Sequence, residues 1–136
     1  MSAADDLERA RLWWRGVTED LAAAQDSAHL PRHRCFFAQQ AAEKAIKTIF
    51  ILCRVEFAKS HDIAALIGDL PEEFRIAIVA EEIDRLSKWA VASRYHETLP
   101  WPTDKQAQQA AATAELIVSA LRDQAIQHGW QLEPSL

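Results

Sequence analysis

The stretch that decides the fold is Pro31–Leu66, with the sequence PRHRCFFAQQAAEKAIKTIFILCRVEFAKSHDIAAL. Between Cys35 and Cys53 this stretch is apolar except at six positions, which are Gln39, Gln40, Glu43, Lys44, Lys47 and Thr48. An α-helix that is apolar around most of its circumference is normally buried against several neighbours. The sequence therefore predicts that this segment is the central helix of a helical bundle.

The charged positions of this helix form a narrow stripe. At about 100° per residue, Gln40, Glu43, Lys44 and Lys47 fall within about a quarter of the circumference. Two interpretations remain open at this point: a narrow solvated face, or the lining of a groove or dimer interface. A short connector follows, and the sequence predicts a second helix that begins at Ser60, with Ser60 as its cap and Asp62 in its first turn.

Helical periodicity extends to both sides of this stretch. A first helix is predicted from about Asp5 to Gln25, with a regular apolar face composed of Leu7, Ala10, Trp14, Val17, Leu21 and Ala24. The residues Ser27 to Pro31 form the turn into the central helix. The short helix after Ser60 ends around Gly68, Asp69 and Pro71.

Two more helices are predicted after Pro71. Pro71-Glu72-Glu73 resembles the first turn of a helix, and Ile76, Val79, Ile83, Leu86 and Ala90 mark one face of it. Thr103 and Gln106 form a capping box for the last helix, which Gly129 stops. We therefore expect an all-α, up-and-down bundle of four long helices with one additional short helix. It occupies residues 1–129, and residues 130–136 form a loose tail.

Composition agrees with one helical domain. The 136 residues are 49% hydrophobic and 26% charged, with only three glycines. The acidic N-terminus lacks the features of a secretory signal, and no apolar run spans a bilayer, so we expect a cytoplasmic protein without membrane contact. Cys35 and Cys53 lie about 27 Å apart on one helix, too far for a disulfide.

Charge is distributed unevenly along the chain. The formal net charge is −5, yet residues 32–61 hold six basic and two acidic residues, a local net charge of +4. A basic centre in an acidic remainder is compatible with a confined phosphate or nucleotide site, or with subunits that pair basic and acidic surfaces.

No sequence pattern indicates a metal or cofactor. His29 and His33 have the helical spacing of two ligands, but Pro31 lies between them and no third ligand is apparent. The sequence has no glycine-rich nucleotide loop and no obvious activated nucleophile. We expect neither metal nor cofactor.

The central stretch resembles the HEPN domain family. The resemblance lies in CFFAQQAAEKAIKTIF followed by KSHDIAAL, together with Arg94-Tyr95 near the end of a later helix. HEPN domains are small helical domains often encoded beside a minimal nucleotidyltransferase. The resemblance implies a homodimer that works with such a separate nucleotidyltransferase in a toxin–antitoxin-like or nucleotide-modifying pair, and that contributes binding or assembly.

Four residues are candidates for binding a nucleotide or RNA. Lys44 and Lys47 would act as cations that face phosphate, Arg94 as a bidentate anion clamp, and His61 as a hydrogen-bonding or titrating group. Arg94 belongs to the loop SRYHETLPWP, residues 93–102, which is either a carrier of function or a loop packed tightly onto the bundle.

The resemblance also offers an alternative function. Some HEPN proteins are metal-independent endoribonucleases that combine an Arg and a His across a dimer interface, and Arg122-Asp123 with His128 matches that spacing. On one continuous helix Arg122 and His128 would point about 120° apart, about 9 Å along the axis, and would not converge within one chain. We therefore favour binding over catalysis. The ribonuclease is the alternative, and a purely structural dimerisation subunit is a third interpretation.

Overall fold

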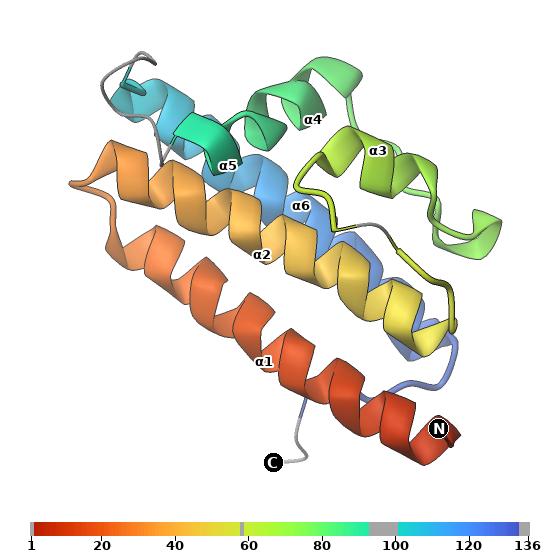
Figure 1. Ribbon diagram of the computed structural model, residues 1–136. Coiled ribbons are helices and arrows are strands. Elements are labelled where there is room, and N and C mark those ends of the chain that lie inside the picture. The colour runs from red at the N-terminus through yellow and green to blue at the C-terminus, as the bar shows by residue number, and fades with distance from the viewer. Residues whose placement is uncertain (1, 58, 93–100, 134–136) are drawn as a thin grey trace.

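The computed structural model describes residues 2–57, 59–92 and 101–133, and every regular element in them is helical. The long helices are α1 (Ala3–Asp26), α2 (Pro31–Leu52) and α6 (Asp104–Gln127). Shorter elements lie between α2 and α6: α3 (Ile63–Gly68), the 3-10 turn η1 (Glu72–Phe74), α4 (Ala80–Ser87) and α5 (Trp89–Ala92). Successive helices α1, α2, α4–α5 and α6 alternate in direction, as in an up-and-down bundle (Figure 1). The expected fold class is confirmed.

The long helices begin where local chemistry favours it. Ser2 forms a reciprocal capping box with Asp5 at the start of α1, and Thr103 forms the predicted one with Gln106 at the start of α6. Pro31 occupies the first turn of α2, where its missing N–H costs nothing. After α6, Gly129 has a φ of 82°, a left-handed conformation that glycine adopts without strain.

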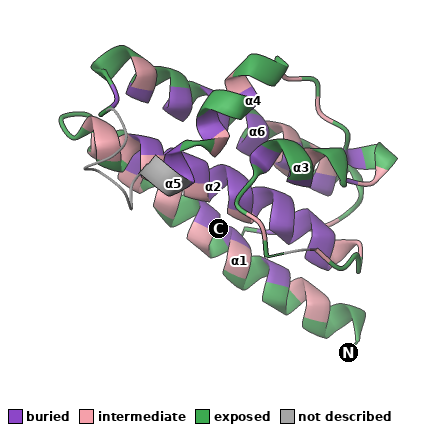
Figure 2. Ribbon diagram, turned by 45° about the horizontal axis from the view of Figure 1, so that its top comes forward, coloured by how far each residue is buried: buried purple, intermediate pink, exposed green. Residues whose placement is uncertain are grey.

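Helix α2 lies at the centre of the molecule. It contacts α1, α6 and all three of the short α-helices. Figure 2 shows it buried along most of its length. The apolar faces of α1 and α6 pack against it. The fully buried side chains of this core include Ala10, Trp14 and Val17 on α1, Ile46, Ile49 and Phe50 on α2, and Ile117 and Leu121 on α6. The prediction of a central helix is confirmed, because the apolar circumference of α2 is covered on several sides.

The segment expected to form one helix from Pro71 onward is divided. After η1 the chain has no regular secondary structure over residues 75–79, and α4 starts only at Ala80. The β-branched residues of this segment disfavour a helix, whereas Glu81 and Glu82 favour a helix start just behind it. Ile83, Leu86 and Ala90 are buried as expected, but Val79 is exposed. Helices α4 and α5 together take the place of the fourth bundle helix, and α3 is the additional short one.

The start of α3 also differs from the expectation. The N-cap is Asp62, whose Oδ1 accepts a hydrogen bond from Ala65 N at 3.3 Å, so the helix begins at Ile63. Ser60 is not the cap. Its Oγ accepts from the backbone N–H of Asp62 at 3.1 Å and thereby shapes the turn before the helix.

The residues after α6 contact the bundle as far as Glu133. Trp130 stacks on Phe74, with ring centroids 5.8 Å apart. Arg11 Nε donates to the carbonyl of Gln131 at 2.8 Å, and Leu132 is buried in the core. Residues 134–136 lie outside the described residues.

The two cysteines are free, as their spacing on α2 predicts. Burial raises the pKa of the Cys35 thiol to about 12, so this residue is an unreactive core group. Across the described residues, no helix combines the length and apolarity needed to cross a bilayer.

Two leucines test the assignment of the core. Leu121→Ala removes a side chain that is 0% exposed and should cost about 3 kcal/mol of unfolding free energy. Leu12→Ala removes a leucine side chain that is 66% exposed and should change the unfolding free energy by less than about 0.5 kcal/mol. Urea unfolding followed by circular dichroism measures both. Equal losses in the two variants would contradict the described packing.

Candidate functional site

The polar stripe of α2 is a buried cluster and not a solvated face. Glu43 is 5% exposed and Lys47 is 6% exposed, and Gln39 is completely buried. The connector after α2 covers this face: Phe57 stacks on Phe50, and Lys47 Nζ lies 5.7 Å from the centre of the Phe57 ring. The interpretation of a solvated face is therefore wrong for Glu43 and Lys47, whereas Gln40 and Lys44, the other two positions of the stripe, are half-buried.

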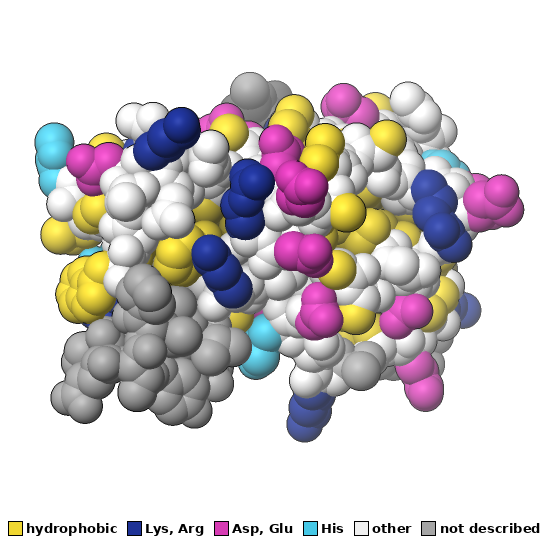
Figure 3. Space-filling model, turned by 90° about the horizontal axis from the view of Figure 1, so that it is seen from above, with side chains coloured by type: hydrophobic (Ala, Val, Ile, Leu, Met, Phe, Trp, Pro, Cys, Tyr) yellow, Lys and Arg dark blue, Asp and Glu magenta, His cyan; other side chains and the backbone are white. Residues whose placement is uncertain are grey.

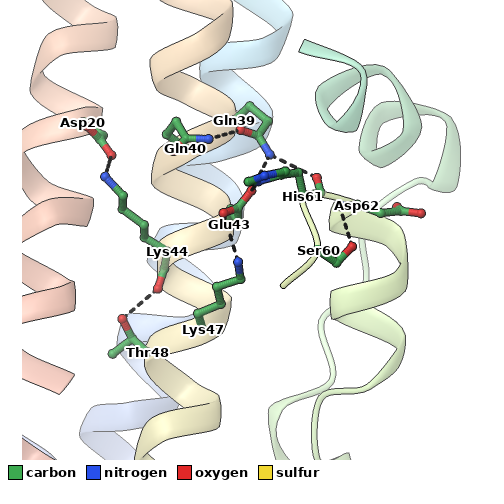
Figure 4. Close-up of polar contacts among 10 residues, drawn as sticks. All are labelled: Asp20, Gln39, Gln40, Glu43, Lys44, Lys47, Thr48, Ser60, His61 and Asp62. Carbon is green, nitrogen blue, oxygen red and sulfur yellow. Dashed lines mark hydrogen bonds and ion pairs between the residues drawn. The ribbon is translucent and has the colours of Figure 1, made fainter. Parts of the chain in front are cut away.

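The carboxylate of Glu43 is the hub of the cluster (Figure 4). Its Oε1 lies 2.8 Å from His61 Nδ1 and accepts from Gln39 Nε2 at 3.0 Å, and its Oε2 accepts from Lys47 Nζ at 3.1 Å. Gln39 Nε2 also donates to the carbonyl of His61 at 3.1 Å. An ionised carboxylate only accepts, so His61 carries its proton on Nδ1. The cluster thus fastens the connector before α3 onto α2.

Two opposing effects act on the Glu43 carboxyl. Burial, the larger single effect, raises its pKa. Hydrogen bonds from Gln39, His61 and Lys47, together with the positive charge of Lys47, outweigh burial and hold the pKa of Glu43 below its ordinary value. The group is therefore a charged acceptor at neutral pH. It does not have the raised pKa that a general acid would use.

Lys44 points away from this cluster, toward α1 (Figure 4). Its Nζ donates to Asp20 Oδ2 at 2.6 Å. Gly16 on α1 lies beside it: a Cβ at that position would stand 3.4 Å from Lys44 Cδ, which is close to an ordinary van der Waals distance. Lys44 therefore joins α1 to α2.

Three of the six basic residues between residues 32 and 61 are paired with carboxylates. Lys44 pairs with Asp20, Lys47 with Glu43, and Arg54 with Asp6 at 2.6 Å. An anion bound by either lysine would have to compete with a carboxylate already in place. His61 likewise faces Glu43. Arg94, the fourth candidate for ligand binding, and most of its loop lie outside the described residues.

The residues of the alternative ribonuclease motif have separate neighbours. Arg122 Nε pairs with Glu133 Oε1 at 2.9 Å, and its guanidinium lies 5.6 Å from the centre of the Trp14 ring. His128 lies beside both Phe74 and Trp130, with centroid distances of 4.6 and 5.5 Å, and its Nδ1 lies 2.8 Å from the carbonyl of Gln124. Within one chain the two side chains do not share a site.

Of the loop at residues 93–102, the last two residues are described by the structure. Trp101 is exposed, and the guanidinium of Arg32 at the start of α2 lies 4.7 Å from its ring centre. This contact connects the entry to α6 with the start of α2. In the described part of the chain no three His, Cys, Asp or Glu side chains are grouped so that they could hold a metal ion.

Comparison with known proteins agrees with this geometry. The all-helical bundle with a central buried helix matches the crystal structure of TT1696 from Thermus thermophilus, with a TM-score of 0.74 and 32% identity over 85% of this chain and 98% of that chain. It also matches ST0689, an archaeal HEPN homologue, with a TM-score of 0.67 and 23% identity over 85% of this chain and 96% of that one. A search of curated proteins gives no significant match.

The molecule thus belongs to the class of small helical bundles represented by these structures. The sequence profile of the HEPN domain matches residues 10–124. This chain is therefore a member of the HEPN domain family.

The sequence pattern placed Glu43 on the polar stripe of α2 but indicated no role for it or for Gln39. One signal was present, because Gln39, Glu43 and Lys47 are spaced four residues apart and share one helix face. No local sequence pattern predicts that His61, on the connector, lies beside Glu43. It depends on the path of the chain between α2 and α3.

Substitutions of Glu43 and Lys47, the buried ion pair, should have non-additive effects on the unfolding free energy. Glu43→Gln leaves the Lys47 charge buried and should cost about 3 kcal/mol of unfolding free energy, and Lys47→Met should cost a similar amount. The double variant should cost clearly less than the sum, because neither charge is left alone. Lys44→Met is the matched control on the same helix. Its more exposed pair with Asp20 should contribute only about 1 kcal/mol. Strictly additive losses in the double variant would contradict the buried pair.

The lowered pKa of Glu43 also predicts a dependence on pH. A carboxyl with a lowered pKa in the folded state stabilises fully above its ordinary value of 4.5 and loses this effect as pH falls through the folded value. The difference in unfolding free energy between wild type and Glu43→Gln should therefore narrow below pH 4.5. Urea unfolding of both proteins across this range measures it, and a difference that stays constant in acid would refute the assignment.

Proposed function

We propose that this chain is a HEPN-domain assembly protein that works with a separate minimal nucleotidyltransferase, in a toxin–antitoxin-like or nucleotide-modifying pair. The observation that carries the proposal is the internal pairing of the candidate reactive groups. Lys44, Lys47 and Arg122 each have a carboxylate partner within the chain. Groups held in this way stabilise a scaffold, and such a scaffold supports binding to another protein better than catalysis.

Membership in the HEPN family supports the same proposal, since minimal nucleotidyltransferases are frequent partners of this family. In this proposal a nucleotide or RNA is held together with the partner. Arg94 remains the candidate anion clamp of this chain. The polar cluster around Glu43 then has a structural task, which is to keep the connector and α3 in a fixed position for assembly.

The alternative is a metal-independent endoribonuclease in which Arg122 of one subunit and His128 of the other act together. This arrangement requires Arg122 to leave Glu133 and His128 to leave the cluster that it forms with Phe74 and Trp130. Both rearrangements cost contacts that the single chain already makes.

Two measurements on the purified full-length chain decide between these functions. Mixed with a minimal nucleotidyltransferase encoded beside its gene, the chain should co-elute as a stable complex in size-exclusion chromatography with light scattering. Incubated with structured RNA in EDTA, wild type should cleave no more than Arg122→Ala and His128→Ala do.

Each outcome has a clear meaning. Cleavage by wild type that is lost in both variants would replace the proposal with the ribonuclease. No complex with the nucleotidyltransferase, and no binding of RNA or nucleotide, would leave a purely structural dimerisation subunit. A complex without cleavage supports the assembly protein.

A further inference from the structure

A small hollow lies between the α4–α5 segment and α6. Its volume is about 130 Å³. Most of its wall is apolar, and the side chains that form this part include Leu86, Trp89, Ala110 and Leu116. An apolar cavity of about 150 Å³ in a protein can hold a benzene molecule. The hollow between α4, α5 and α6 therefore has room for one aromatic ring.

A buried hydroxyl group in the wall of this hollow has no partner. Thr113 on α6 is 4% exposed, and its side chain makes no hydrogen bond within the described residues. By contrast, the hydroxyls of Thr18 and Thr48 each donate to the carbonyl four residues earlier in their helix. In the described part of the chain, the fully enclosed polar side-chain atoms without a partner belong to Arg34 and Gln124. The Thr113 hydroxyl is therefore open to the hollow and can bind a polar group there.

Two cations lie at the edge of the hollow. Arg85 on α4 and Lys88 directly after α4 are three positions apart, so their side chains leave the same side of the segment. Lys88 Nζ lies 4.7 Å from the centre of the Trp89 ring, which holds the ammonium group beside the apolar wall. Arg85 has a long, exposed pair with Glu81, at 3.7 Å, and Lys88 has no carboxylate partner among the described residues. Figure 3 shows basic side chains next to hydrophobic surface on the side of the molecule that carries α4, so an anion with an apolar body suits this surface.

The other polar groups at the edge indicate the class of anion. Glu82 places one carboxylate there, so Arg85, Lys88 and Glu82 together carry one positive charge. This charge matches a single carboxylate better than a phosphate group, which is more strongly negative. On the α6 side, Gln106 Oε1 accepts from Thr103 N, which leaves its amide nitrogen to donate to a ligand.

We infer that the hollow between α4, α5 and α6 binds a small aromatic carboxylate with a polar group on its ring. The ring fills the apolar space, the carboxylate lies between Arg85 and Lys88, and the polar group reaches the Thr113 hydroxyl. This site is separate from Lys44, Lys47, His61 and Arg94, the candidates for binding a nucleotide or RNA. It goes beyond the proposed function, which requires no small carboxylate.

Nuclear magnetic resonance titration of the isotope-labelled, full-length chain tests the site. Benzoate should produce saturable amide shifts confined to residues 82–89 and 106–116, with a dissociation constant of about 1 mM. Either meta- or para-hydroxybenzoate should bind about threefold more tightly, because the Thr113 hydroxyl then gains a partner. Benzylamine has the same ring and the opposite charge, and it should produce no saturable shift.

Variants test the two polar parts of the site separately. Lys88→Met keeps most of the side chain but removes the charge, and it should weaken benzoate binding about tenfold. Lys59→Met, at an exposed lysine on the connector outside the hollow, changes the net charge equally and should leave binding unchanged. Thr113→Val keeps the shape of the wall and should abolish the preference for the hydroxybenzoate while benzoate still binds. Unchanged circular dichroism spectra verify that all three variants are folded.

Five results would overturn the inference. They are no saturable shift with any of the carboxylates, binding of benzylamine as strong as that of benzoate, and equal losses in Lys88→Met and Lys59→Met. The other two are no preference for either hydroxybenzoate in wild type, or a preference that survives Thr113→Val. None of these results bears on the nucleotidyltransferase complex, which is measured separately.

Discussion

A carboxylate buried in the middle of the molecule, that of Glu43, constrains the rest of the structure. A charge without water must have a counter-charge and donors to every accessible lone pair, otherwise its burial costs several kcal/mol. Glu43 obtains these from Gln39 and Lys47 on its own helix and from His61 on the connector. The connector must therefore cross α2 at the level of Glu43, and this fixes where α3 begins.

The same helix faces α1 through a different kind of contact. The ion pair between Lys44 and Asp20 joins the two helices. Helix α6 packs on another side through alanines and larger aliphatic residues. Helix α2 can serve as the core of the bundle because its surface consists of large apolar residues, of alanines, and of charged residues that are paired within the chain.

This arrangement changes how the charges of the sequence are interpreted for function. A cluster of basic residues in the sequence suggested a site for phosphate, yet Lys44, Lys47 and Arg54 serve the bundle itself. The HEPN fold alone does not determine an activity, because function depends on sites added to a fold.

The amino-acid sequence by itself determined the features that depend on nearby residues. The apolar circumference of α2, the faces of α1 and α6, the capping box at Thr103 and the stop at Gly129 all follow from side chains within one or two helical turns. Tertiary structure decided the rest. Whether residues 75–79 are helical depends on two nearly balanced local preferences, a helical periodicity against β-branched residues. In the fold, Gln124 on α6 donates a hydrogen bond to the Arg75 carbonyl of the non-helical segment. The partnership of Glu43 with His61 joins residues eighteen positions apart, and no local pattern encodes it, because it exists only once the connector has folded back over α2.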